Sequence, residues 1–154
     1  MRIHIAADHA GFELREHLIE HLRQAGHDVV DHGYKEYDAL DAYPPVCFSA
    51  GQAVVDDEGS LGIVIGGSGN GEQMAANLVK GVRAALVWNE STAELAREHN
   101  NANVMALGAR QHSIEEATAF VDIFVSTGYD LGSRHQSRID MMSAYEDGQR
   151  EFSA

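Results

Sequence analysis

The sequence predicts an α/β/α sandwich, in which a parallel sheet of five strands lies between layers of helices. Two observations predict it: short apolar runs alternate with amphipathic stretches, and a glycine-rich turn directly follows a buried strand. With 154 residues, of which 44% are hydrophobic, the chain is long enough to bury a core and is expected to form a single domain, residues 1–154.

The first half of the chain is predicted to alternate strand and helix twice. Leu14, Leu18 and Leu22 recur at helical spacing, and Gly26 follows where a helix commonly ends. The expected elements are a strand at 2–7, a helix at 12–25, a strand at 27–31 and, after a loop that holds Tyr43, Pro44 and Pro45, a helix to about Val55.

The second half is predicted to continue this alternation and to end in a helix. Ser91 and Ser113 are each followed three residues later by a glutamate, Glu94 and Glu116, which is the capping-box pattern of a helix start. The expected elements are a strand at 61–65, a helix at 72–79, a strand at 83–87, a helix opened by Ser91, a strand at 104–107, a helix from Ser113 to about Val125 and a C-terminal helix at 134–149.

Charge and cysteine content exclude several classes of function. A net charge of −13 opposes binding to nucleic acid or to an anionic membrane. No apolar run approaches the roughly 20 residues of a membrane span, and Cys47 has no partner for a disulfide or a zinc knuckle, so we expect a cytoplasmic protein. An anionic small molecule can still bind where the few arginines are concentrated.

Parallel sheets bind ligands beyond the carboxyl ends of their strands. Three groups are predicted there: Asp8 and His9 after the first strand, Gly66–Glu72 after the third, and Gly108–Arg110 after the fifth. Four glycines among the seven residues of Gly66–Glu72 allow the backbone to aim N–H groups into one anion-binding concavity. The segment matches neither the Gly-Lys-Ser/Thr loop nor the dinucleotide fingerprint, which belongs after the first strand.

Ser68 and Glu72 add a hydroxyl and a carboxylate to this concavity. The hydrogen-bond donors suit a developing oxyanion, and the carboxylate suits a base. The alternative is a tight turn with Glu72 as an ordinary charge on the first turn of a helix, and the pattern alone favours neither.

Arg134 and Arg138 lie four residues apart and therefore share one face of a helix. Two guanidinium groups placed in this way can grip one phosphate, and the alternative is ordinary pairing with acids such as Asp140. His99 ends a predicted helix, and a lone histidine there is more often a surface residue.

Two other patterns carry less weight. His17, Glu20 and His21 match the H-x-x-E-H string of some metallopeptidases, but a short helix rich in Glu and His produces this string by chance. We therefore expect no metal site there. Cys47, flanked by Val46 and Phe48, is expected to be a buried thiol and not a nucleophile.

Five strings closely resemble those of the ribose-5-phosphate isomerase B family, in the family's order and over nearly the whole chain, from about Ile3 to Tyr145. They are Asp8-His9-Ala10-Gly11, Gly66-Gly67-Ser68-Gly69-Asn70-Gly71-Glu72-Gln73, Ala75-Ala76-Asn77, Arg97-Glu98-His99-Asn100-Asn101 and Arg134-His135-Gln136. The resemblance implies a Rossmann-like fold and isomerisation of a sugar phosphate through an enediolate, without metal or other cofactor. It also implies a homodimer whose active sites draw on both subunits, and it leaves pairing into tetramers open.

The resemblance also implies a role for each matching residue. Glu72 moves the proton between C2 and C1, and Asp8 and His99 assist opening of the sugar ring, with His99 reaching in from the partner and Asn100 beside it. Ser68 is also catalytic, because its hydroxyl holds the sugar oxygens as charge develops. The remaining residues bind substrate: Gly67, Gly69, Asn70 and Gly71 at the sugar oxygens, His9, Arg110, Arg134 and Arg138 at the phosphate, and Tyr43 as a wall of the pocket.

The chain departs from the family pattern at two positions. Some members carry a catalytic cysteine where this chain has Gly66, so this chain resembles the branch in which a glutamate is the base. Leu78 stands where many members carry lysine, with no implied consequence. Two alternatives stay open: an isomerase of the same fold acting on a tetrulose, allose or galactose phosphate, and a sugar-phosphate-binding module without turnover.

Overall fold

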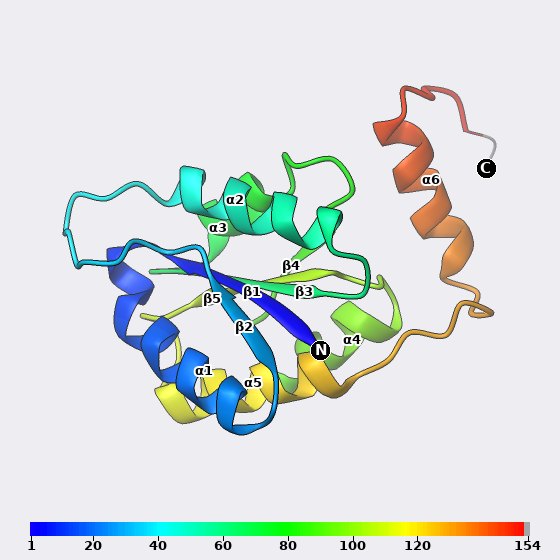
Figure 1. The fold of residues 1–154 in the computed structure, drawn as a ribbon. Coiled ribbons are helices and arrows are strands. Elements are labelled where there is room, and N and C mark those ends of the chain that lie inside the picture. The colour runs from blue at the N-terminus through cyan, green and yellow to red at the C-terminus, as the bar shows by residue number, and fades with distance from the viewer. Residues whose placement is uncertain (153–154) are drawn as a thin grey trace.

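The computed structural model describes residues 1–152 and has a five-stranded sheet at its centre (Figure 1). All strand pairs are parallel, and their spatial order is β2-β1-β3-β5-β4. The predicted fold class is therefore confirmed. The strands are β1 (Arg2–Ala7), β2 (Asp28–Asp31), β3 (Leu61–Gly66), β4 (Ala84–Leu86) and β5 (Val104–Gly108).

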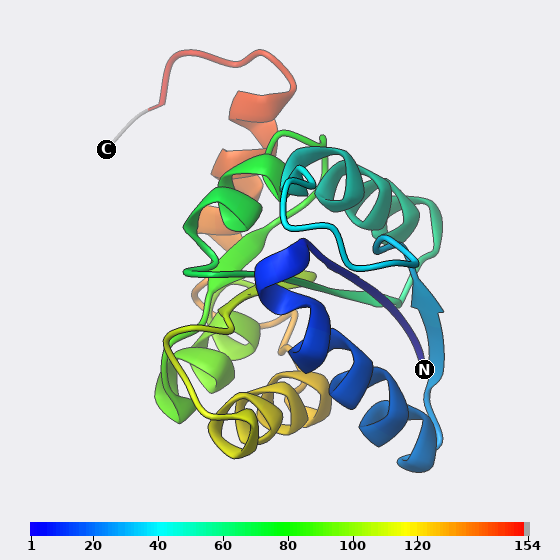
Figure 2. The same ribbon diagram turned by 90° about the vertical axis from the view of Figure 1, so that its left-hand side faces the viewer.

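Helices cover both faces of the sheet, with α2 and α3 on one face and α1, α4 and α5 on the other (Figures 1 and 2). The last helix, α6, stands outside these two layers. The helices are α1 (Phe12–Gln24), α2 (Tyr43–Asp56), α3 (Asn70–Ala76), α4 (Glu90–Glu98), α5 (Ile114–Ser126) and α6 (Gln136–Glu146), and a 3₁₀ turn, η1 (His9–Gly11), precedes α1.

Two hydrophobic clusters hold the layers together, because successive side chains of a strand point to opposite faces. Ile3 and Ile5 of β1 pack on the side of α1 and α5, whereas Ala6 packs on the side of α2. All six residues of β3 are buried, as expected for a central strand covered on both faces. This double coverage explains the uninterrupted apolar run that predicted β3.

The sequence predicted two helix starts from capping-box patterns, and the structure confirms one of them. Ser113 caps α5, and its hydroxyl accepts a hydrogen bond from the N–H of Glu116 at 3.1 Å, which confirms that prediction. The start predicted at Ser91 is wrong: Asn89 caps α4, with Oδ1 accepting from the N–H of Thr92 at 2.8 Å. Asparagine and serine cap helices about equally well, so local preference did not distinguish them.

Several other boundaries differ from the predictions. The helix α2 already begins at Tyr43, so the expected loop at Tyr43–Pro45 is wrong; the fixed φ of proline suits a first helical turn. The helix α3 begins at Asn70, two residues before the expected start. The helix α6 is shorter than the predicted 134–149, and Arg134 precedes it.

The strand order places the predicted ligand groups at one edge of the sheet. Ala7 of β1 pairs with Ile65 of β3, and Gly66 of β3 pairs with Gly108 of β5. These three adjacent strands therefore end side by side. Asp8, the Gly66–Glu72 segment and Arg110 follow directly, at the edge where open parallel sheets bind ligands.

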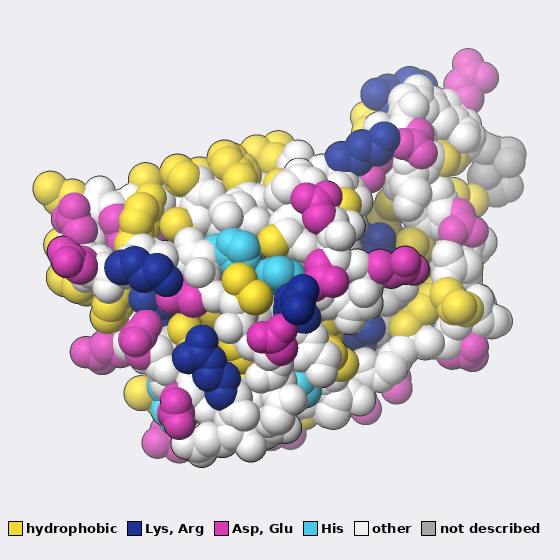
Figure 3. Space-filling view, viewed as in Figure 1, with side chains coloured by type: hydrophobic (Ala, Val, Ile, Leu, Met, Phe, Trp, Pro, Cys, Tyr) yellow, Lys and Arg dark blue, Asp and Glu magenta, His cyan; other side chains and the backbone are white. Residues whose placement is uncertain are grey.

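Two features concern the surface of the described residues 1–152. No helix within this range is both long and apolar enough to span a membrane. Acidic and basic side chains are interspersed over the face seen in Figure 3, and that face shows no broad patch of a single sign.

Candidate active site

The turn between β3 and α3 depends on glycine at its centre. Gly69 has φ +80°, which L side chains rarely adopt, and a Cβ there would lie 2.8 Å from the carbonyl carbon of Leu107. The loop is thus pressed against the end of β5. Within it, the hydroxyl of Ser68 accepts a hydrogen bond from the N–H of Asn70 at 3.3 Å.

The carboxylate of Glu72 lies directly over the backbone of Gly66. Glu72 is only 4% exposed, and a Cβ added at Gly66 would overlap its carboxylate. Because glycine has no side chain, position 66 leaves room for the carboxylate of Glu72. In family members with a cysteine at this position, the cysteine side chain would claim the same volume.

Burial changes the acid strength of Glu72. Loss of solvation raises the pKa of the carboxyl above its ordinary value, a hydrogen bond from its own backbone N–H opposes this shift, and the negative charge of Asp8 adds to it. A carboxylate with a raised pKa is a stronger base than an exposed one. Burial therefore makes the Glu72 carboxylate a stronger base than an exposed glutamate.

Asp8, His9 and Asp41 form a second cluster beside the loop. Asp8 caps η1, with Oδ1 accepting from the N–H of Ala10 at 2.9 Å. The Oδ1 atom of Asp41 lies 2.9 Å from both the backbone nitrogen and Nδ1 of His9. One ligand atom from each of the three residues lies within 4.8 Å of the others, so these are the residues of the described chain best placed to hold a cation.

Tyr43 and Arg110 border the glycine loop on two sides. A Cβ at Gly71 would lie 2.6 Å from the ring of Tyr43, so the ring rests on the loop backbone. Arg110 lies over Gly67, where an added Cβ would be 3.5 Å from the arginine side chain. Its N–H also donates to the Gly67 carbonyl at 3.1 Å.

The remaining predicted site residues lie elsewhere in the same chain. His99 follows α4 and precedes the start of β5, and Val104 at that start pairs with Gly62 near the start of β3. His99 is thus at the opposite end of the sheet from Glu72. Its ring stacks on that of His135 with centroids 4.1 Å apart. Burial, His99 and the nearby Arg134 and Arg138 lower the pKa of His135, so these cations gather around it.

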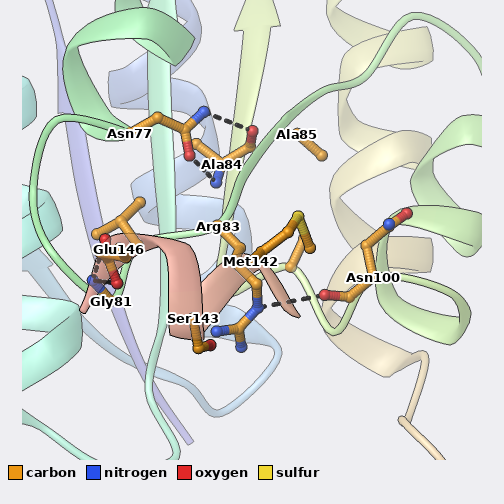
Figure 4. A pocket seen from close by; sticks show the side chains of 11 residues that line it. Asn77, Gly81, Arg83, Ala84, Ala85, Asn100, Met142, Ser143 and Glu146 are labelled. Atoms are coloured by element: carbon orange, nitrogen blue, oxygen red, sulfur yellow. Dashed lines mark hydrogen bonds between the residues drawn. The ribbon is translucent and has the colours of Figure 1, made fainter. Parts of the chain in front are cut away.

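Figure 4 shows the hollow between β4 and α6, with a volume of about 310 Å³. Asn100 and Met142 line it together with Arg83, whose Nε donates to the carbonyl of Asn100 at 3.2 Å. Glu72 is not among its lining residues. Of the predicted site residues, Asn100 alone lines the hollow, which is therefore separate from the glycine loop.

Sequence reasoning missed the residues that hold the turn after α4. Arg97 donates to the side-chain oxygen of Asn101 at 3.1 Å, and Arg83 donates to its backbone carbonyl at 2.8 Å. Asn101 has φ +42°, a left-handed conformation that asparagine tolerates at a helix C-terminus. These contacts fix the segment that carries His99 and Asn100.

A family model described as Ribose/Galactose Isomerase matches residues 3–142. The chain belongs to the ribose/galactose isomerase family. Ribose-5-phosphate isomerase B of Mycobacterium tuberculosis (strain ATCC 25618 / H37Rv) is 55% identical to it over 95% of this chain and 90% of the relative. The protein of the same name from Escherichia coli (strain K12) is 36% identical over 94% and 96% of the two chains.

Solved structures of family members agree with the fold. Ribose-5-phosphate isomerase B from Mycoplasma genitalium with bound ribulose-5-phosphate matches with a TM-score of 0.91 and 44% identity, over 96% of this chain and 97% of that chain. The counterpart from Clostridium thermocellum matches with a TM-score of 0.90 and 36% identity, over 96% and 98% of the two chains.

Among the other residues of this isomerase singled out above, the H-x-x-E-H histidines are engaged by α5. Nε2 of His17 lies 3.1 Å from the hydroxyl of Thr118, and Nε2 of His21 lies 2.7 Å from Oδ1 of Asp122. These contacts account for both imidazoles without a metal. Leu78 is exposed, and nothing in the structure explains its difference from lysine.

Cys47 of the isomerase is buried, near the carboxylates of Asp8 and Glu72. Loss of solvation raises the pKa of its thiol to about 12, and the charges of Glu72 and Asp8 contribute to the shift. The thiol therefore stays protonated at neutral pH and is a poor nucleophile, in agreement with the buried role expected from the sequence.

Proposed function

We propose that this protein, acting as a single cytoplasmic isomerase domain, interconverts ribose 5-phosphate and ribulose 5-phosphate with Glu72 as the base. The observation that carries the assignment of the base is the buried carboxylate of Glu72 lying over Gly66 beside a turn rich in backbone donors. The names of the relatives and the ribulose-5-phosphate in the Mycoplasma genitalium structure support the choice of substrate.

The reaction moves one proton between neighbouring carbons. Glu72 accepts the C2 proton of the open-chain aldose, and the electron pair of that C–H bond forms the C1–C2 double bond as charge moves to the C1 oxygen. Return of the proton to C1 and transfer of the O2 proton to O1 complete the ketose. Ser68 and the N–H groups of the loop stabilise the enediolate, and Asp8 and His99 assist ring opening.

The phosphate needs positive charge in a protein with a net charge of −13. Arg110 and His9 lie on the glycine-loop side of the site, and Arg134 and Arg138 complete it from the partner. Within residues 1–152 none of these arginines forms an ion pair with a carboxylate, and Asp140 instead accepts a hydrogen bond from Gln136 at 2.7 Å. This arrangement favours phosphate binding over ordinary surface pairing.

We propose a homodimer whose active sites draw on both subunits. Glu72 and His99 lie at opposite ends of the sheet within one chain, so they can share a site only across an interface. The helix α6 stands outside the helix layers and exposes Met141, Met142 and Tyr145, which a partner would cover.

Mixing two inactive variants tests the shared site. Dimers of Glu72→Gln and dimers of His99→Asn should each lose turnover. Subunit exchange between them should recover about one quarter of wild-type activity, because half of the dimers are mixed and each mixed dimer has one intact site. Mixing two Glu72→Gln preparations is the control. No recovery, despite subunit exchange shown by native mass spectrometry, would contradict the shared site.

Steady-state rates on sugar phosphates of four to six carbons test the substrate. We expect the highest kcat/KM with ribose 5-phosphate and ribulose 5-phosphate. A higher value for a tetrulose, allose or galactose phosphate would reassign the substrate. Binding without turnover on every sugar would make the protein a binding module. Activity should also be insensitive to chelators.

A further inference from the structure

A buried carboxylate in the loop between β2 and α2 lies behind His9. The Oδ1 atom of Asp41 is 2.9 Å from the backbone nitrogen of His9 and 2.9 Å from its Nδ1 atom. The side chain of Asp41 is only 5% exposed, and its Oδ2 atom is buried with no hydrogen-bond partner in the described residues.

An ionised carboxylate only accepts hydrogen bonds, so this contact assigns a proton to Nδ1 of His9. The Nε2 atom is then the ring nitrogen left to meet a ligand. A carboxylate behind a ligand-binding histidine fixes the tautomer and the orientation of the ring in this way. The hydrogen bond from the backbone N–H of His9 to Asp41 also fixes the main chain at His9.

We propose that Asp41 is a positioning residue for phosphate binding, which holds His9 with Nδ1–H inward and Nε2 toward the substrate phosphate. The proposal rests on the function proposed above, in which His9 binds the phosphate. A phosphate oxygen accepts a hydrogen bond only from Nε2–H, so His9 must carry both protons in the complex. The carboxylate of Asp41 keeps the ring oriented for this contact.

The charged groups around His9 support this role. Oδ2 of Asp8 is 4.0 Å from Nδ1, so a second carboxylate, from the η1 cap, faces the same side of the ring. The ring of Tyr37 meets His9 edge-on. Glu72 on α3 and Arg110 after β5 border the same site. In the part of the chain that the structure describes, His9 is the only basic side chain within 4.0 Å of the Asp41 carboxylate. A buried carboxylate oxygen without a donor gains most from such a neighbour.

The loop itself is held at both ends, as positioning requires. Asp31 accepts a hydrogen bond from the N–H of Gly33 at 2.8 Å, and the hydroxyl of Tyr34 donates to the carbonyl of Ala42 at 3.0 Å. Gly33 packs directly against the fully buried Arg15 of α1. Asp41 is therefore presented to His9 by a fixed backbone.

Asp41→Asn tests the charge of this carboxylate, because the amide keeps the shape and one acceptor oxygen. We expect KM to rise about tenfold, while kcat changes less than about threefold. The inhibition constant of inorganic phosphate should rise with KM. Asp38→Asn, an exposed change in the same loop, is the matched control.

Nitrogen-15 spectra of His9 without substrate separate this proposal from the proposed function, because they require no turnover. The wild type should show Nδ1–H, and Asp41→Ala should shift the ring toward Nε2–H. An unchanged tautomer would overturn the proposal. So would an Asp41→Asn variant with a lower thermal midpoint but a wild-type KM, since Asp41 would then only stabilise the loop. An inactive wild type with the expected spectra would instead reject the isomerase assignment.

Discussion

Glu72→Gln should lower kcat by about 10²- to 10⁴-fold and leave substrate affinity within a few fold. The amide has nearly the same shape as the carboxylate but cannot accept a proton, so only the proton-transfer step is lost. Steady-state kinetics give kcat, and calorimetry with a substrate analogue gives the affinity. Glu13→Gln is the matched control, since Glu13 is an exposed glutamate in the first turn of α1.

Because the pKa of Glu72 is raised, kcat and the stability of the fold should depend on pH in opposite directions. The base is active when ionised, so kcat should rise as pH increases through the raised value. Between the unfolded and the folded pKa, the folded protein binds more protons than the unfolded chain, so the stability contributed by this group falls as pH increases. At pH values above the folded pKa of Glu72, the Glu72→Gln variant should be more thermally stable than the wild type.

Retention of wild-type kcat by Glu72→Gln would reject the assigned base. It would restore the alternative in which Glu72 is an ordinary charge on the first turn of α3. Loss of kcat with an equal loss of affinity would instead indicate a collapsed loop. Thermal unfolding near neutral pH distinguishes these cases, because a collapsed loop lowers the midpoint and removal of a buried charge raises it.

Gly66→Ala should lower kcat by about 100-fold while the chain still folds. The added methyl group would overlap the carboxylate of Glu72 and push it away from the reacting carbons, and a displacement of about 1 Å costs a rate factor of this order. The measurement is kcat together with the circular dichroism spectrum. Gly128→Ala is the control, because a Cβ at that position meets nothing within 4 Å.

A double-mutant cycle sharpens this prediction. If Gly66 acts by giving Glu72 its place, Gly66→Ala should cost little further activity in the Glu72→Gln background. Additive losses would show that Gly66 acts independently of the carboxylate. Wild-type activity of Gly66→Ala alone would show that the carboxylate needs no such space.

Local sequence patterns predict the type of most secondary-structure elements and the composition of the glycine loop. These features depend on residues close in the chain: the alternating apolar runs of the strands, the spacing of Leu14, Leu18 and Leu22, and the Ser113 cap of α5. The segment Gly66–Glu72 likewise carries its donors and its carboxylate within seven residues. The parallel sheet and the end of the sheet that carries the loop could therefore be predicted.

Packing between segments that are distant in the chain determines which of these groups are in contact. The contact of Asp41 with His9 joins residues 32 positions apart, and it arises because the loop after β2 returns over the end of β1. Strand order likewise places His99 at the far end of the sheet from Glu72, and side-chain packing seats the carboxylate of Glu72 on Gly66. Local propensity encodes turns and caps, but contacts between distant segments depend on strand order and register, which no short pattern specifies.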